Sequence, residues 1–267
     1  MNHKPVVWIT GASSGIGRAL ALEYAKQGSQ LILSSRREAE LQEVKQHCEH
    51  QGLNSQDILV LPLDVTQHNE MESKSRLANE FKGRIDLLIN NAGVSQRSTC
   101  LETEMKTYRR LFEVDVFGQI ALTKAVLPIM IKQGSGHIAI TASVAGKIGV
   151  PYRTGYCAVK HAVMGFFDSL RSEVAHQNIR VSTITPGYIQ TDVARNALTG
   201  EGLITGKTEQ EIESGMNVND CAKVIVKGLK KGKIEIAVGK GIEMHALWIK
   251  RFLPSLMAKI LERKYHK

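Results

Sequence analysis

The sequence predicts an α/β fold: a single domain with a doubly wound, mostly parallel sheet and helices on both faces. Short apolar runs of strand length alternate with longer stretches of helical periodicity, the order that a parallel sheet with crossover helices produces. The chain has 267 residues, 43% hydrophobic and 23% charged, so it can bury one large core without a second domain. No internal repeat or low-complexity linker divides it.

The predicted elements follow one another in strand-then-helix order. A short buried strand over 5–11 leads into a helix that starts near Ile16 and ends where Gly28 provides a C-terminal cap. Further strands are expected over 30–35, 57–65, 85–93, 136–143, 179–187 and 233–239. Helices are expected over 37–52, 69–83, 117–134 and 156–177, the third lying inside a longer helix. We assign residues 1–240 to this domain and residues 241–267 to a basic, amphipathic C-terminal tail.

The net charge of +9 resides in the last part of the chain. From residue 223 onward there are twelve Lys/Arg and three Asp/Glu, a surplus equal to the net charge of the whole chain. The preceding part is therefore balanced, and we expect no nucleic-acid partner.

The tail combines these positive charges with apolar residues at helical spacing. The apolar positions, interrupted at Pro254, are Ile249, Phe252, Leu253, Leu256, Met257, Ile260 and Leu261. Three roles remain open: packing on its own domain or a partner subunit, covering a substrate cleft as a lid, and resting on an anionic membrane surface.

We find no targeting or membrane signal in the sequence. The N-terminus has no long apolar stretch behind a basic flank, so no signal peptide is expected. No apolar run approaches the roughly 20 residues of a membrane span. Cys48, Cys100, Cys157 and Cys221 lie far apart without a CxxC pair, which favours reduced thiols over disulfides or a zinc site. We therefore expect a cytoplasmic protein without a bound metal.

Three glycines join the first predicted strand to the first helix. Gly11, Gly15 and Gly17 of "TGASSGIG" lie where a glycine pattern is informative. Glycines let the backbone approach a pyrophosphate, and the helix N-terminus offers free N–H groups and a partial positive charge. A plain turn of this kind usually needs one glycine, so three indicate a dinucleotide site. The spacing is GxxxGxG and not the commoner GxGxxG.

A tyrosine and a lysine stand four residues apart in "YCAVK". At helical spacing Tyr156 and Lys160 share one face and lie about one turn apart. Alone this pattern is weak evidence for a catalytic role, since both residues are common on helix surfaces. The surrounding motifs decide between the two interpretations.

That context resembles the short-chain dehydrogenase/reductase family. "TGASSGIG", "NNAG", "TAS", "YCAVK" and "PGYIQTD" occur in the order and at the distances typical of this family, and the resemblance covers about residues 6–240. It implies a Rossmann fold and hydride transfer between a nicotinamide cofactor and a carbonyl or secondary alcohol. It also implies a homodimer or homotetramer built around Phe117 and Tyr156. The tail is similar to those of members that act on lipophilic alcohols and ketones, so a lipophilic small-molecule substrate is expected.

The end of the second strand selects the cofactor. Members that use NAD carry Asp where Ser35 stands here, and Arg36 follows at once. An acid would repel a 2′-phosphate, whereas a guanidinium can bind it bidentately. We therefore expect NADP(H). Ser14 is a departure, because some NADP-using members carry a basic residue there.

The resemblance implies the remaining cofactor contacts. Asp64 and Val65 match the adenine-pocket stretch, although Asp64 could equally cap the next helix. Thr191 and the backbone of Ile189 would face the carboxamide. The complete expected cofactor set is Gly11, Ser13, Ser14, Gly15, Ile16, Gly17, Ser35, Arg36, Asp64, Val65, Asn91, Ala92, Gly93, Tyr156, Lys160, Pro186, Gly187, Ile189 and Thr191.

The resemblance also implies the catalytic residues Ser143, Tyr156 and Lys160. A free tyrosine has a pKa of about 10, and a nearby cation such as Lys160 would lower it. Ser143 would hydrogen-bond the substrate oxygen. Asp115 stands where the family carries a fourth catalytic residue, an Asn. An ionised Asp only accepts hydrogen bonds, and its charge would raise the pKa of Lys160 if the two lie close.

Other functions remain as alternatives. A dinucleotide-binding sensor or regulator with weak or no catalysis would fit Asp115, and a membrane- or nucleic-acid-binding scaffold would use the basic tail. The substrate cleft is expected to be lined by Gln96, Arg97, residues 150–153 and the glycine-bearing loop 194–215, which could be a mobile lid.

Overall fold

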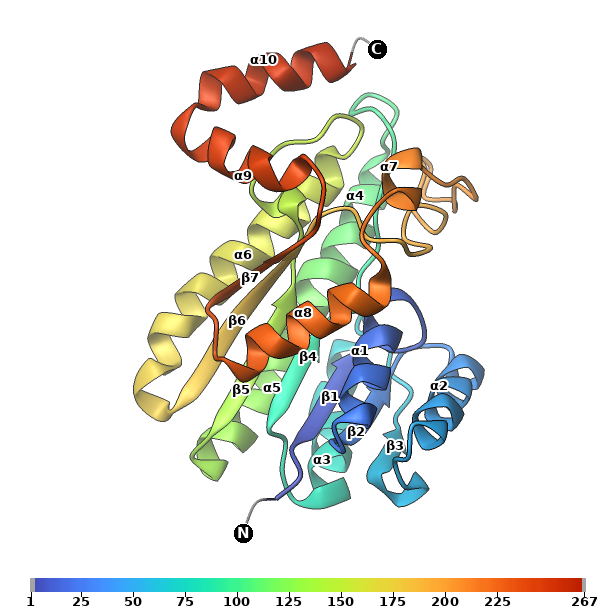
Figure 1. Cartoon of the computed structure of the whole chain (residues 1–267), viewed down its shortest axis with the longest axis vertical. Coiled ribbons are helices and arrows are strands. Elements are labelled where there is room, and N and C mark those ends of the chain that lie inside the picture. Colours follow the sequence, from blue (N-terminus) through green and yellow to red (C-terminus); the bar gives the residue numbers. More distant parts are fainter. Residues whose placement is uncertain (1–2, 266–267) are drawn as a thin grey trace.

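Seven strands form one sheet at the centre of the protein in the computed structural model, which describes residues 3–265 (Figure 1). Their order across the sheet is β3-β2-β1-β4-β5-β6-β7, and every neighbouring pair is parallel. The strands are β1 (Val6–Thr10), β2 (Gln30–Ser34), β3 (Ile58–Val60), β4 (Leu87–Asn90), β5 (Gly136–Thr141), β6 (Ile179–Pro186) and β7 (Glu235–Val238). The predicted Rossmann-type fold is confirmed.

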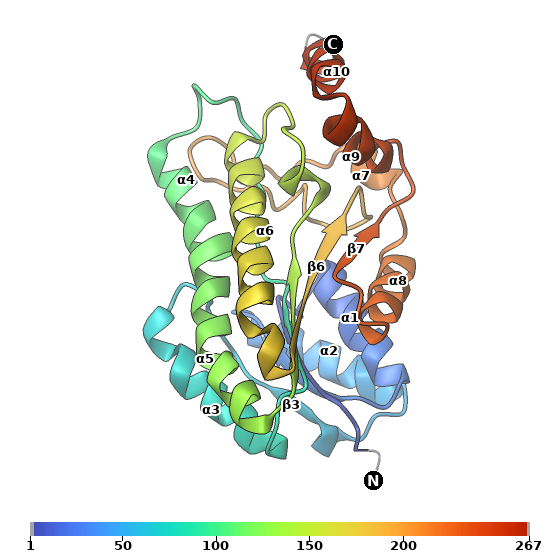
Figure 2. The ribbon, with the colours of Figure 1, turned by 90° about the vertical axis from the view of Figure 1, so that its left-hand side faces the viewer.

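Helices cover both faces of this sheet, as the edge-on view shows (Figure 2). One face carries α1 (Gly15–Lys26), α2 (Glu38–His50) and α8 (Val218–Lys230). The other carries α3 (Met71–Lys82), α4 (Met105–Phe112), α5 (Gly118–Gln133) and α6 (Thr154–Val174). Because both faces are covered, the central strands β1 and β4 are wholly buried.

The main differences from the sequence prediction concern lengths and one missed helix. The expected strand over 57–65 is regular only over β3, and α8 was not anticipated. Gly28 follows the end of α1 with a φ of +71°, as a C-terminal cap requires. The long helix is interrupted by a π-helical segment, Glu113–Phe117, between α4 and α5.

This long helix, Met105–Gln133, is apolar and long enough to cross a membrane by length and composition alone. The expectation that no such segment exists was therefore wrong. The helix carries seven charged residues, Lys124 among them, and only an 18-residue window of it is apolar enough for a membrane span. Leu122, Val126 and Met130 are buried in the core, so the segment is apolar because it packs on the sheet.

The topology gathers the sequence motifs at one edge of the sheet. The strand order reverses at β1: β2 and β3 lie on one side of it, and β4 lies on the other side as its direct neighbour. Asn90 at the end of β4 pairs with Ile140, and Thr141 at the end of β5 pairs with Ile184. Ligands of such sheets bind outside the carboxyl ends of the strands at this reversal.

The C-terminal tail forms two helices, α9 (Glu243–Phe252) and α10 (Pro254–Tyr265), drawn in red at the top of Figure 1. Pro254 begins α10, where it needs no intrahelical donor. Ala246 and Met257 are buried in a small cluster with Val144 and Ile148, directly after β5. The tail thus packs on its own domain beside the carboxyl ends of the strands.

Candidate active site

A cavity of about 490 Å³ lies at the carboxyl ends of the central strands. All but one of the expected cofactor and catalytic residues line it, drawn from eight separate segments of the chain. The exception is Gly17. A Cβ at that position would lie 2.2 Å from the Gly11 carbonyl oxygen, so Gly17 lets α1 pack against the glycine loop.

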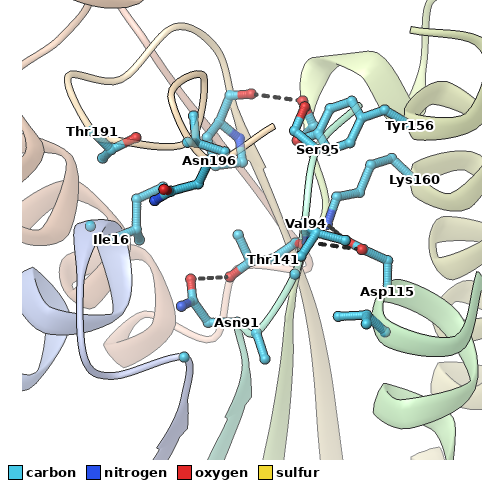
Figure 3. Close-up of a pocket in the computed structure, with 18 of the residues that line it drawn as sticks. Ile16, Asn91, Val94, Ser95, Asp115, Thr141, Tyr156, Lys160, Thr191 and Asn196 are labelled. Carbon is cyan, nitrogen blue, oxygen red and sulfur yellow. Dashed lines mark hydrogen bonds and ion pairs between the residues drawn. The ribbon is translucent and has the colours of Figure 1, made fainter. Parts of the chain in front are cut away.

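The glycine loop lies against the segment that follows β4. Gly11 has a φ of +64°, and a Cβ there would lie 3.0 Å from the Ala92 Cα. Asn91 binds the same loop, since its Nδ2 donates to the Thr10 carbonyl oxygen at 3.1 Å. The Thr141 hydroxyl donates to Asn91 Oδ1 at 3.2 Å (Figure 3). Asn91 therefore joins the ends of β1, β4 and β5 and shapes the floor of the cavity.

Two arginines follow β2 beside the glycine loop. Arg36 lines the cavity, as expected. Arg37 was not expected, yet its Nη2 donates to Ser13 Oγ at 3.0 Å and to Ser14 Oγ at 3.2 Å. The helix dipole disfavours a cation at the start of α2, so a basic residue there suggests a functional reason. This was the only sign of a role for Arg37 in the sequence. Ser14 is thus joined to a guanidinium supplied by another segment.

Asp64 does not cap the next helix, whose N-cap residue is Glu70. It lines the cavity, and its Oδ1 accepts hydrogen bonds from the Thr66 backbone N–H at 3.0 Å and the Thr66 hydroxyl at 2.8 Å. The carboxylate therefore stabilises the turn before α3 while its residue remains beside the cavity. Val65 lies next to it, and Gly118 packs so closely that a Cβ there would be 2.8 Å from the Val65 Cβ.

Tyr156 and Lys160 project from α6 into the cavity on one helical face (Figure 3). The Lys160 Nζ lies 5.6 Å from the centre of the Tyr156 ring. Ser143 stands across from them after β5. Its Oγ accepts from the Ala145 N–H at 3.1 Å and donates weakly to the Pro186 carbonyl oxygen at 3.5 Å. The three expected catalytic side chains thus face one space.

Asp115 forms an ion pair with Lys160. Its Oδ1 lies 2.9 Å from the Lys160 Nζ, and its Oδ2 accepts from the Val94 N–H at 3.0 Å. Lys160 also donates to the Thr141 carbonyl oxygen at 3.1 Å. Both members of the pair are buried. The π-helical segment carries Asp115 to this position, and Gly93 makes room for it, since a Cβ there would lie 2.6 Å from Oδ1.

Burial and charge act together on this pair. Burial alone would lower the pKa of Lys160, but the charge of Asp115, with a smaller contribution from Tyr156, outweighs it and raises that pKa. Burial raises the pKa of Asp115, and Lys160 and the Val94 N–H oppose this rise. The ammonium is therefore held in its charged form beside Tyr156.

Arg153 closes the side of the cavity next to Tyr156. Its guanidinium donates to Ser95 Oγ at 2.7 Å and pairs with Glu209 at 2.5 Å. The side chains of Arg153 and Glu209 are only 11% and 10% exposed, so the pair is shielded from water. Glu209 belongs to the 194–215 loop, which Arg153 thereby ties to the cavity wall.

The expected lining residues are only partly confirmed. Val150, Arg153 and several members of the 194–215 loop line the cavity. Gln96 instead points to Ser98, where its Nε2 donates to the hydroxyl at 2.7 Å. Ser95 is the lining residue of that segment. Leu198 donates its N–H to the Ser95 carbonyl oxygen at 2.8 Å, so part of the loop expected to be mobile is anchored.

Sequence reasoning also missed Glu243, the first residue of α9. It lines the cavity beside Gly187, and its Oε1 accepts from the Tyr188 N–H at 3.2 Å. It lies more than fifty residues after the motif that it contacts, so no local pattern indicated it.

Comparison with known proteins is consistent with this geometry. Residues 5–202 match the family model described as short chain dehydrogenase. The chain is 40% identical over 252 residues to human Dehydrogenase/reductase SDR family member 7, covering 94% of this chain and 74% of the relative. It is 38% identical over 264 residues to the Anopheles gambiae SDR family protein 7-like, covering 98% and 83%.

Solved structures show the same fold. A Burkholderia phymatum short-chain dehydrogenase/reductase in complex with NAD superposes with a TM-score of 0.83, at 24% identity and 95% coverage of both chains. An alcohol dehydrogenase from Thermococcus sibiricus complexed with 5-hydroxy-NADP superposes with a TM-score of 0.75, at 25% identity, covering 89% of this chain and 97% of that one.

Proposed function

The chain belongs to the short-chain dehydrogenase/reductase family, and on that premise we propose that it is an NADP(H)-dependent carbonyl reductase or alcohol dehydrogenase. The observation that carries the proposal is the convergence of Ser143, Tyr156 and Lys160 on one cavity that the glycine loop also lines. A binding protein has no need of a tyrosine held beside a buried ammonium, whereas proton transfer to a carbonyl oxygen requires one.

The residues of the cavity fit a dinucleotide. The Gly11 turn approaches Ala92 so closely that only glycine fits, which leaves backbone open at the N-terminus of α1 for a pyrophosphate. Pro186 lies beside Ser143, whose hydroxyl is 3.5 Å from the Pro186 carbonyl oxygen. Ile189 and Thr191 of the same segment line the cavity, where a nicotinamide would lie. When bound, the cofactor supplies or accepts the hydride.

The chain's own residues would handle the proton and the substrate oxygen. Tyr156 donates a proton to the carbonyl oxygen during reduction and takes it back during oxidation. Lys160 stabilises the phenolate by its charge, and Ser143 hydrogen-bonds the same oxygen and stabilises the charge that develops there. Asp115, whose Oδ1 lies 2.9 Å from the Lys160 Nζ, holds that ammonium in its charged form.

Three residues after β2 support NADP(H) over NAD(H). Ser35 offers no carboxylate to repel a 2′-phosphate, and Arg36 and Arg37 both line the cavity. Arg37 is held toward the glycine loop by Ser13 and Ser14. Two guanidinium groups can bind a phosphate with charge-assisted hydrogen bonds.

Replacing Arg36 or Arg37 by Ala is expected to raise the KM for NADPH about tenfold or more, the effect of losing a charge-assisted hydrogen bond. The KM for NADH should change little, because that cofactor lacks the phosphate. Steady-state kinetics with both cofactors measure this, and Arg76→Ala, an exposed arginine on α3, is the matched control. An equal effect on both cofactors would contradict phosphate recognition.

The proposed activity is tested by oxidation of NADPH and NADH, followed at 340 nm, against a panel of ketones and aldehydes. Turnover with preference for NADPH is the expected result. Preference for NADH would overturn the cofactor proposal and leave the reaction class intact. Tight NADPH binding without turnover of any substrate would favour the alternative, a dinucleotide sensor. The buried Asp115–Lys160 pair is the observation in favour of that alternative.

The lining of the cavity favours a lipophilic small-molecule carbonyl or alcohol. Besides polar residues such as Ser95, Arg153 and Asn196, apolar side chains line the cavity: Val94, Val114, Val144, Ile148, Val150, Val193, Leu198, Ile204 and Ile212. Such a wall binds a substrate by removing its apolar surface from water. We also propose a homodimer or homotetramer through the surface of α4, α5 and α6, where Met105 and Phe117 are exposed.

The outer face of the tail suits peripheral contact with a membrane that carries anionic lipids. Trp248, Phe252 and Leu256 are 67%, 64% and 46% exposed, and Lys250 and Arg251 stand beside them. Apolar side chains that enter the interface, flanked by positive charges, are typical of such contact. A cytoplasmic protein that binds in this way would meet lipophilic substrates at the bilayer.

We expect the protein to co-sediment with vesicles that contain phosphatidylserine and to be released by salt, which screens the attraction. Phosphatidylcholine vesicles should bind less of it. The double variant Trp248→Ala/Phe252→Ala should lose binding, while Leu77→Ala, an exposed apolar residue on α3, should retain it. Equal sedimentation of the two variants would exclude the tail as the contact surface.

A further inference from the structure

We propose that Glu243 is a positioning residue that couples the C-terminal helices to the turn formed by Pro186, Gly187 and Tyr188. This inference rests on the proposed function, because the turn is expected to hold the nicotinamide end of the cofactor. It assigns the tail a role inside the active site, in addition to any role of its outer face.

The Glu243 carboxylate lies in a close-fitting backbone cradle. Its Oε1 accepts from the Tyr188 N–H at 3.2 Å. A Cβ at Gly187 would lie 2.4 Å from the same oxygen, and one at Gly241 would lie 2.0 Å from Oε2. A side chain at either glycine would have to displace the Glu243 carboxylate. The two glycines therefore leave room for the carboxylate beside the turn.

The turn is held from a second direction by the sheet. The Gly187 N–H donates to the Val238 carbonyl oxygen at 2.8 Å, at the end of β7. The turn therefore makes two successive contacts through its backbone N–H groups, one from Gly187 to the end of β7 and one from Tyr188 to Glu243 at the start of α9. Only a short connection separates Val238 from Glu243 in the chain. A shift of α9 would therefore be transmitted to the turn.

The same helix also contacts the segment that follows Ser143. Ala246 of α9 and Met257 of α10 are buried against Val144 and Ile148. The Ser143 hydroxyl in turn reaches the Pro186 carbonyl oxygen at 3.5 Å. The tail thus contacts both neighbours of the reacting space, the turn and the Ser143 segment, and we infer that it holds them at a fixed separation.

If Glu243 only stabilised α9, its variants would affect NADPH binding differently. An acid in the first turn of a helix stabilises it through the helix dipole, whatever hydrogen bond its side chain makes. Glu243→Asp retains the charge at the start of α9 but shortens the side chain by one methylene, so it loses contact with the Tyr188 N–H. Glu243→Gln loses the charge but retains an acceptor of the same length. These two variants separate the hydrogen bond from the charge.

The test is NADPH binding, followed by the change in its fluorescence, together with kcat/KM for a ketone that the wild type reduces. We expect Glu243→Ala and Glu243→Asp to weaken NADPH binding about tenfold, the effect of a lost hydrogen bond to a charged group. Glu243→Gln should remain within about twofold of the wild type. Glu262→Ala, an exposed acid on α10, is the control and should bind as the wild type does.

Thermal unfolding of each variant shows whether the fold is retained. Glu243→Asp keeps the helix-dipole interaction and should unfold near the wild-type temperature even if Glu243→Ala does not. Wild-type-like NADPH binding by Glu243→Asp, or a loss in Glu243→Gln equal to that in Glu243→Ala, would overturn the inference. Failure of the wild type itself to bind NADPH would refute the proposed cofactor, so the two failures are distinguishable.

Discussion

Tyr156→Phe is expected to abolish turnover while NADPH binding persists. The substitution removes one oxygen atom and with it the proton donor to the carbonyl. General acid catalysis contributes about 10² to 10⁴ in rate, and kcat should fall by at least that factor. The ring would keep its packing, since the Arg153 guanidinium lies 5.9 Å and the Lys160 Nζ 5.6 Å from its centre. Binding of the cofactor should therefore change little.

Single-turnover absorbance measurements at 340 nm, with NADPH affinity measured in parallel, test this prediction. Tyr188→Phe is the matched control, because that tyrosine also lines the cavity. It should retain most of the activity. A Tyr156→Phe enzyme with more than a tenth of the wild-type kcat would show that another group donates the proton.

Substitution of Asp115 is expected to have the second large effect. The replacement residue determines whether the effect falls on folding stability or on the pH dependence of activity. Asp115→Ala leaves the Lys160 ammonium buried without its counter-ion, and breaking a buried pair in this way costs about 3–5 kcal/mol of unfolding free energy. Asp115→Asn still offers an oxygen to the Val94 N–H and an amide to its surroundings. It should therefore fold, with a smaller loss of stability.

The pH dependence of Asp115→Asn follows from the sign of the shift. In the wild type the charge of Asp115 raises the pKa of Lys160, so the ammonium, and activity that requires it, persist to higher pH. Without that charge the pKa of Lys160 falls, and the alkaline limb of the kcat profile should move to lower pH. NADPH affinity at neutral pH should change much less.

The contribution of Lys160 to folding stability follows from the same raised pKa. The part contributed by Lys160 is present below its unfolded pKa of about 10.4 and is lost only as the pH rises through the raised folded value. The stability advantage of the wild type over Asp115→Asn should therefore be full at pH 7 and shrink only as the pH rises above about 10.4. Chemical denaturation at neutral pH and at a pH above that value, together with pH–rate profiles, measures both effects. An unchanged alkaline limb in Asp115→Asn would disprove the coupling.

Much of this architecture was determined by local sequence. Strands buried on both faces must be apolar throughout, and helices between them must show helical periodicity, so their alternation could be read directly. The position of Gly28 after α1 and the glycines of the loop reflect backbone conformations that other residues adopt with difficulty. The spacing of Tyr156 and Lys160 needed only helix geometry. These features depend on neighbours in the chain.

Two other features were not predicted from the sequence. The helix α8 was missed although its apolar residues Cys221, Ile225 and Leu229 follow helical spacing and are buried against α1. The π-helical segment was also unexpected, since nothing in "EVDVF" specifies an extra residue in that turn. The local signal for α8 was therefore present and overlooked, whereas the π-helical segment became evident only from the assembled layers.

What the sequence by itself determined was the fold, the glycine loop and the identity of most cofactor and catalytic residues that line the cavity. Only the tertiary structure decided how they meet. Asp115 reaches Lys160 because the π-helical segment turns it inward, and Arg37 reaches Ser13 because α2 begins beside the glycine loop. Glu243 reaches Tyr188 across more than fifty residues. The physical reason is that a hydrogen bond or ion pair depends on separations of a few ångströms, which the packing of distant segments sets.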